Sequence, residues 1–180
     1  KNTGRTIFTL RNGKGGDARF PKSYAEKVMC LFPGQRSVIH CHRVKREDIA
    51  CRSGNVCIEF WADAGGRLSE AAHEVSVDGC VVEARPGIPL ILRPGMSVCV
   101  PPLTWHRFWG REDADPASLR GSCAGHGPAL SIEVSSVCDD LNDNIFLTRG
   151  ERFPAIDEDE ARYRYLCSEY GQGRATALSQ

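Results

Sequence analysis

The sequence predicts an all-β protein, a small barrel or sandwich, and two features of the chain point to this fold class. Between about residues 24 and 135, short runs rich in valine, isoleucine and aromatic residues alternate with glycine, proline and aspartate turn signals. Helical periodicity is nearly absent from the same stretch. The 180 residues fit the usual size of one domain, so we expect a single domain with this core, followed by an extension over residues 136–180.

The candidate strands are short and closely spaced. They cover residues 25–32, 37–42, 55–61, 74–77, 80–84, 88–92, 97–100, 106–109 and 129–135, and residues 5–10 are also strand-like. Asp78 and Gly79 separate two of these runs, and glycine tolerates the positive φ of a tight two-residue turn. The sequence therefore predicts a β-hairpin at this dipeptide.

The segments beyond these strands have a different composition. Residues 111–128 are polar and aperiodic, which is typical of a long surface loop. Later, acidic residues 157–160 precede a stretch over 161–166 that contains arginines, the charge order that a helix macrodipole favours. We therefore expect a short C-terminal helix.

The overall charge excludes some classes of partner. Lysine plus arginine equals aspartate plus glutamate at 23 each, and the isoelectric point is about 7.1, so no global field attracts nucleic acid or an anionic membrane. No apolar run approaches the ~20 residues of a membrane helix, and the start of the chain lacks a signal pattern. We expect a soluble cytoplasmic protein that binds a small neutral molecule or another protein.

The cysteines indicate free thiols. There are nine, an odd number, without CxxC pairs or an even framework. Several alternate with apolar residues, as buried thiols acting as small hydrophobic groups would. We expect them to be reduced, as in the cytoplasm.

A pair of histidines suggests a metal site. His40 and His42 are separated by one residue, so on a strand both imidazoles project to the same face, while Cys41 points to the other. On its own, such a pair is equally typical of two solvent-facing residues. Glu47 and His106 are the further candidate ligands, and three imidazoles with one carboxylate suit Mn, Fe, Co, Ni or Zn.

The spacing around this pair resembles the first sequence motif of the cupins. Gly34, His40, His42, Glu47 and Gly54 occupy its fixed positions, with five, one, four and six residues between them. The resemblance implies a cupin double-stranded β-helix, or jelly-roll barrel, that holds the metal ion inside.

The second cupin motif is partly present. Gly95, Pro101 and His106 occupy its fixed positions. Leu103 stands where the family usually has glycine, and Gly110 where it often has asparagine. These departures concern the shape of the local turn and leave the ligand His106 in place.

A longer series of motifs resembles the D-lyxose isomerases, which are cupin sugar isomerases. The motifs lie, in order, at residues 9–13, 40–49, 65–69, 108–110, 133–135, 139–146 and 152–160. Members of this family look like longer chains with a helical N-terminal section. We therefore expect such a section to be absent from this chain, which begins at Lys1 without methionine.

The resemblance implies an aldose–ketose isomerase that uses one divalent metal ion, commonly Mn. It interconverts D-lyxose with D-xylulose, and often D-mannose with D-fructose, through a metal-stabilised enediol. The chemistry needs a base that moves a proton between C1 and C2. Glu133 is the candidate, because a carboxylate within an apolar strand is costly unless it is functional or held by a structural cation.

Further residues are candidates for binding the sugar. Lys45 could act in catalysis, and Lys27 could hydrogen-bond substrate oxygens, although lysines are usually solvated. Asp140 and Asp143 could bind sugar hydroxyls, but Asp and Asn clusters also form turns. Phe108 could line the pocket, although aromatic residues on a strand are more often part of the core.

Two other functions fit the same ligands, since one fold carries many activities. One is an iron-dependent cupin dioxygenase, because the same four ligands can hold a redox metal. The other is a non-catalytic sugar-binding cupin. Glu133 and the lysines favour the isomerase, since oxygen activation gives them no role. The resemblance also implies a homodimer.

Overall fold

The computed structural model describes residues 3–14, 16–111, 128–139, 142–148 and 159. Its contacts divide the chain into two units, Lys1–Thr148 and Arg149–Gln180, and every strand belongs to the first. The expected C-terminal helix and most of the expected loop over 111–128 lie outside the described residues, and the single-domain expectation stays a prediction. No helix in the described part of the chain is long and apolar enough to cross a membrane.

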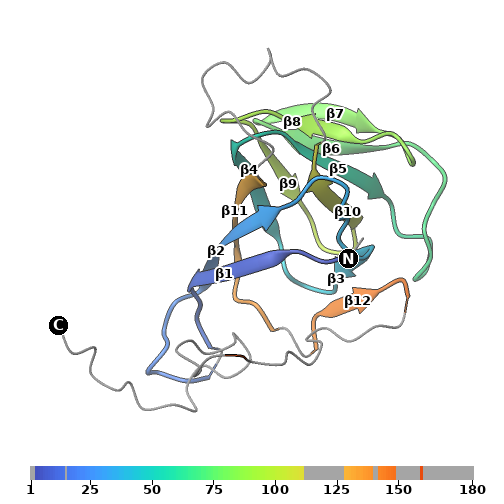
Figure 1. Ribbon diagram of the computed structural model, residues 1–180. Coiled ribbons are helices and arrows are strands. Elements are labelled where there is room, and N and C mark those ends of the chain that lie inside the picture. Colours follow the sequence, from blue (N-terminus) through green and yellow to red (C-terminus); the bar gives the residue numbers. More distant parts are fainter. Residues whose placement is uncertain (1–2, 15, 112–127, 140–141, 149–158, 160–180) are drawn as a thin grey trace. The chain divides into compact units, whose positions relative to one another are not determined.

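The described residues form twelve strands in two antiparallel sheets (Figure 1). The strands are β1 (Thr6–Arg11), β2 (Tyr24–Leu31), β3 (His40–His42), β4 (Glu47–Ser53), β5 (Val56–Trp61), β6 (His73–Val77), β7 (Cys80–Ala84), β8 (Leu90–Leu92), β9 (Ser97–Val100), β10 (Trp105–Gly110), β11 (Ala129–Ser136) and β12 (Asn144–Phe146). One sheet has the order β1-β2-β11-β4-β9-β6-β7, and the other β12-β3-β10-β5-β8. The fold is the predicted all-β cupin double-stranded β-helix.

Ten of these strands correspond to predicted runs, and the predicted hairpin at Asp78 and Gly79 joins β6 to β7. The run over 37–42 is strand only from His40. Two strands were missed. Strand β4 begins at Glu47, outside every predicted run, and β12 pairs with β3. Glu47 therefore lies in the other sheet from the two histidines that precede it.

The two sheets share one core, because side chains from both pack together. Alternation on β2 and β11 turns every second side chain inward, as expected for strands with one buried face. The fully buried members of this core from both sheets include Met29, Leu31, Ile49, Val56, Ile58, Phe60, Leu92, Val98, Val100 and Phe108. Glu133 falls on the same inward face of β11 as Ala129. The interior of the barrel thus contains both an apolar core and the charged side chain of Glu133.

Both departures from the second cupin motif have a structural explanation. Leu103 has φ of 57°, the left-handed conformation that glycine adopts freely, and its N–H donates to His42 O at 2.8 Å. Leu103 therefore adopts a backbone conformation that glycine takes without strain. At Gly110 the backbone passes so close to Leu31 that a Cβ would lie 2.2 Å from the Leu31 carbonyl oxygen. Only glycine fits there without a shift.

The seven cysteines that the structure describes are all free, as expected. Cys41, Cys51 and Cys57 are buried. Cys41 packs with Trp61 and Trp105 in a separate small cluster, which confirms that it points away from the neighbouring histidines.

The close approach at Gly110 gives a stability prediction. Gly110→Ala would force the Leu31 and Gly110 backbones apart, and we expect a loss of about 1–3 kcal/mol in the free energy of unfolding. Urea denaturation measures it. Gly79→Asn is the control, because its Cβ would meet nothing within 4 Å and asparagine tolerates positive φ. Equal midpoints for Gly110→Ala and the wild type would contradict this account.

Candidate metal centre and active site

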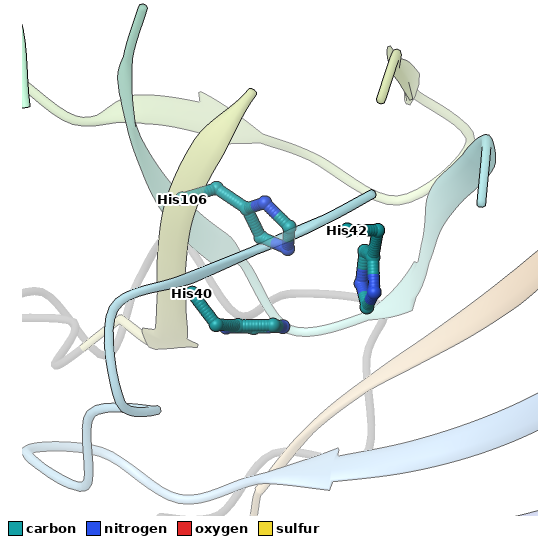
Figure 2. A group of neighbouring side chains, drawn as sticks. All are labelled: His40, His42 and His106. Atoms are coloured by element: carbon teal, nitrogen blue, oxygen red, sulfur yellow. The ribbon is translucent and has the colours of Figure 1, made fainter. Parts of the chain in front are cut away.

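Three histidines on the paired strands β3 and β10 lie close together. His40 and His42 lie on β3, His106 lies on β10, and the register pairs His106 directly with His40. One ring nitrogen of each lies within 4.8 Å of the others (Figure 2). All three are buried, with at most 4% of any residue exposed. This group could hold a metal ion.

The backbone orients two of these rings. His40 Nδ1 lies 2.9 Å from Val38 O, and His106 Nδ1 lies 3.0 Å from Thr104 O. A carbonyl oxygen can only accept, so in each ring Nδ1 carries the proton and Nε2 keeps its lone pair. Such contacts fix the tautomer and the ring direction that a metal ligand needs.

His40 and His42 are also kept neutral. Burial, followed by the charges of His106 and Arg5, sets the pKa of His40 well below its usual value. Burial likewise lowers the pKa of His42, although the nearby Glu47 carboxylate opposes the shift. A neutral imidazole is the form that binds a metal ion.

Glu47 brings a carboxylate to the same place from the other sheet. Its Oε1 lies 2.9 Å from His106 Nε2, and its Oε2 lies 3.5 Å from His42 Nε2. Burial alone would raise the pKa of Glu47, but Lys45 and the two rings outweigh it and hold the pKa well below its usual value. Glu47 therefore carries its negative charge inside the barrel.

The polar atoms of this cluster fit a cation. Oε2 of Glu47 accepts a 2.6 Å hydrogen bond from Lys45 Nζ, whereas Oε1 is buried with no hydrogen-bond partner among the described residues. The same holds for His106 Nε2 and both ring nitrogens of His42. Buried polar atoms are normally satisfied. One divalent ion would satisfy Glu47 Oε1, His106 Nε2 and one ring nitrogen of His42, and an imidazole–carboxylate set admits Mn, Fe, Co, Ni or Zn.

Beside the histidines, two lysines and two glutamates form a buried chain of ion pairs. Lys45 Nζ donates to Glu47 Oε2 at 2.6 Å and to Glu133 Oε1 at 2.9 Å. Lys27 Nζ donates to the same Glu133 oxygen at 2.9 Å. All four residues are at most 3% exposed. The chain connects one candidate metal ligand to the candidate base.

The ion pairs fix the charge of each member. Burial and the Glu47 charge would raise the pKa of Glu133, but Lys45 and Lys27 outweigh them and lower it. Burial would lower the pKa of each lysine, but the neighbouring carboxylates raise it overall. Near neutral pH both glutamates are therefore ionised and both lysines protonated.

Comparison with known proteins identifies the family. A sequence model of the D-lyxose isomerase family matches residues 1–170. The chain belongs to the D-lyxose isomerase family. The D-lyxose/D-mannose isomerase of Escherichia coli O157:H7 is 42% identical over 173 residues, covering 95% of this chain and 71% of that protein. The enzyme of the same name from Serratia proteamaculans is 43% identical over 169 residues, covering 93% and 69%.

Solved structures share the fold. The L-ribose isomerase of Acinetobacter sp. DL28 in complex with L-ribose has a TM-score of 0.55 at 18% identity, over 81% of this chain and 71% of that one. The L-ribose isomerase of Geodermatophilus obscurus has a TM-score of 0.54 at 20% identity, over 81% and 70%. The family assignment makes this chain a sugar isomerase of the aldose–ketose type.

In this sugar isomerase, three of the predicted substrate residues also contact other residues of the protein. Asp143 is buried, and its two oxygens accept the backbone N–H groups of Val44 and Lys45 at 2.8 and 3.2 Å. It also lies 3.6 Å from His42 Nδ1, so it positions the turn after β3. Phe108 is 1% exposed and belongs to the core, and Lys27 is engaged by Glu133. Asp140 lies outside the described residues.

Some contacts of the site were not foreseen. Phe146 of β12 stacks on His40 with ring centroids 5.8 Å apart, and Cys138 Sγ lies 3.2 Å from Lys27 Nζ. The backbone carbonyls of Val38 and Thr104, which orient two of the histidines, could not be predicted from sequence, because every residue has a backbone carbonyl. For Phe146, the three residues Asn144–Phe146 are too short a run to mark a strand.

The ligand role of His106 can be tested by metal content. We expect His106→Ala to weaken binding of Mn or Zn at least a hundredfold, because one of four convergent donors is lost. Metal analysis after dialysis and calorimetric titration measure this. His73→Ala is the control, because His73 lies on β6 and outside the cluster. Stoichiometric, tightly held metal in His106→Ala would show that His106 is not a ligand.

Proposed function

We propose that this chain interconverts D-lyxose and D-xylulose, and also D-mannose and D-fructose, with one divalent metal ion held by His40, His42, Glu47 and His106. The buried contact that joins Glu47 to Glu133 through Lys45 carries the proposal. It puts a candidate metal ligand and a candidate base beside each other. The names of the two curated relatives support the choice of sugars.

The reaction moves one proton between C1 and C2 of the sugar and a second proton between the oxygens on these carbons. A bound divalent ion would act as a Lewis acid on the C1 and C2 oxygens and so make the neighbouring C–H bonds more acidic. Glu133 accepts the proton and returns it to the adjacent carbon. Its ionised state near neutral pH supports this role, because only a carboxylate can accept the proton.

Lys45 has a different part in the same step. Its raised pKa keeps the ammonium protonated, so it cannot act as a base. It holds the Glu133 and Glu47 carboxylates in place and can donate a hydrogen bond to an oxygen that gains negative charge. Lys27 holds Glu133 from the other side and, in our proposal, also contacts substrate oxygens.

Mn is the metal ion that we propose, because it suits a reaction without electron transfer, and Zn, Co, Fe and Ni fit the same ligands. Asp140, Asp143 and Phe108 stay proposed substrate contacts. We also propose that the protein is a cytoplasmic homodimer.

The activity itself is the first test. We expect the Mn-loaded protein to convert D-lyxose to D-xylulose without oxygen, to lose this activity after chelation, and to regain it when Mn is added back. Ketose formation followed by chromatography measures it. A dioxygenase would require oxygen and a redox metal, and a sugar-binding protein would bind D-lyxose unchanged. Either result with metal-loaded protein would contradict the proposal.

The base assignment has a separate test. We expect Glu133→Gln to keep its metal but to lower kcat by about 10²–10⁴, because the amide cannot accept the proton. Metal analysis and initial rates on D-lyxose measure the two effects.

Glu59→Gln is the matched control for this change. Glu59 is also a buried carboxylate, 4% exposed, but it pairs with Arg107 in the other sheet. Its activity should stay near that of the wild type. If Glu133→Gln keeps its metal and its kcat, another group carries the proton.

A further inference from the structure

Strand β12 brings a phenylalanine to the metal centre. It pairs with β3 so that Phe146 lies opposite His40 and Ile145 lies opposite Cys41. Ile145 and Cys41 pack in the small cluster with two tryptophans, on the side of β3 that faces away from the histidines. Because side chains alternate along a strand, Phe146 projects to the other side, together with His40. Phe146 therefore faces the candidate metal ligands.

The phenyl ring stacks on the imidazole of His40. The two ring centroids are 5.8 Å apart, and the ring planes are inclined by 26°. Phe146 is only partly buried, and neither hydrophobic cluster of the described residues includes it. A phenyl side chain contributes most to stability when apolar neighbours surround it. Here it packs on a candidate metal ligand instead, which points to a role in the site rather than in the core.

The same kind of arrangement occurs at His106. Its ring also stacks on a phenylalanine, Phe108, with centroids 6.1 Å apart and planes 6° apart. Thr104 O holds Nδ1 of this ring, as Val38 O holds Nδ1 of His40. Two of the three histidines therefore have a hydrogen bond at one edge of the ring and a phenyl ring against one face.

The two contacts restrain different motions of the imidazole. A hydrogen bond at Nδ1 fixes one atom of the His40 ring but still lets the ring tilt about that atom, because the Cβ–Cγ torsion of histidine has broad minima. A phenyl ring packed against the face of the imidazole opposes this tilt. The ring nitrogen left for a metal ion then stays beside those of the other two histidines. A side chain that is already ordered loses less entropy when the ion binds.

We propose that Phe146 is a positioning residue for the metal centre, whose phenyl ring holds the His40 imidazole in the orientation in which it binds the divalent ion. The proposal rests on the proposed function in one respect, the assignment of His40 as a metal ligand. It adds β12 to the strands that build the site. Because Phe146 acts through His40, its loss weakens metal binding and leaves sugar binding to the metal-loaded protein unchanged.

Phe146→Ala tests the proposal when the metal-free protein is titrated with Mn or Zn in a calorimeter. Removing the stacked ring should weaken metal binding about three- to tenfold, which corresponds to the usual strength of one aromatic pair. The number of ions bound per chain should not change, because the proposed ligands all remain. With saturating metal, KM for D-lyxose should stay within about twofold of the wild-type value.

The geometry of the metal centre has a separate readout. Co(II) loaded in place of Mn absorbs visible light with a spectrum that depends on the arrangement of its ligands. Phe146→Tyr keeps the ring, so its Co(II) spectrum and metal affinity should match those of the wild type. Phe146→Leu keeps apolar bulk without a ring, so it should show the changed spectrum and weaker binding expected of Phe146→Ala. If Phe146→Ala does not fold, the result for Phe146→Leu decides.

Ile145→Val is the matched control on the same strand. Ile145 packs on the opposite face of β12, so a slightly smaller side chain there perturbs the strand and leaves the stacked ring in place. Its metal affinity and Co(II) spectrum should be those of the wild type.

The possible failures can be told apart. Wild-type metal affinity and Co(II) spectra in Phe146→Ala and Phe146→Leu, or an equal loss of affinity in Ile145→Val, would overturn the role of Phe146 and leave the proposed function standing. A raised KM with unchanged metal affinity would make Phe146 a substrate contact and would overturn it as well. The expected metal results in a protein that forms no ketose would overturn the proposed function alone. Wild-type protein that binds no divalent ion would overturn both.

Discussion

One ammonium group, Lys45 Nζ, holds together the charged interior of this barrel. It donates to a carboxylate on β4 and to another on β11, and Lys27 from β2 completes the chain of ion pairs. Burying any one of these charges alone would be costly, and removing one partner leaves another uncompensated. The chain of ion pairs therefore requires β2, β4 and β11 to be in register. The stability of the barrel and the geometry of its site consequently depend on the same contacts.

The two sheets contribute different kinds of side chain to the site. The smaller sheet supplies His40, His42 and His106, and the larger one supplies Glu47 and Glu133. A site at the junction of two sheets is rigid because each contributing strand is paired on both sides. Backbone carbonyls orient two of the imidazoles, and lysines orient the carboxylates. Little reorganisation is then needed when a cation or a sugar binds.

Much of the fold was predictable because strand alternation and turn residues are local. The hairpin at Asp78 and Gly79 and the strands on both sides of it follow directly from such signals. Strand β4 was missed because its residues, Glu47–Ser53, include two acids and an arginine, and Ile49 is the one large apolar side chain among them. Three-residue β12 was missed because it exists only through pairing with β3.

The sequence by itself determined the candidate metal ligands, since His40, His42, Glu47 and His106 have the cupin spacing and a strand sends alternate side chains to one face. A longer series of motifs along the chain led to the sugar isomerase family. Only the tertiary structure decided the burial and the protonation of the other charged residues of the site. Lys27, Lys45 and Glu133 are far apart in the chain, and strand pairing buries them together and sets their protonation. It also turned Asp143 into a buried partner of backbone N–H groups. Burial and pairing depend on which strands meet, and no local pattern encodes that.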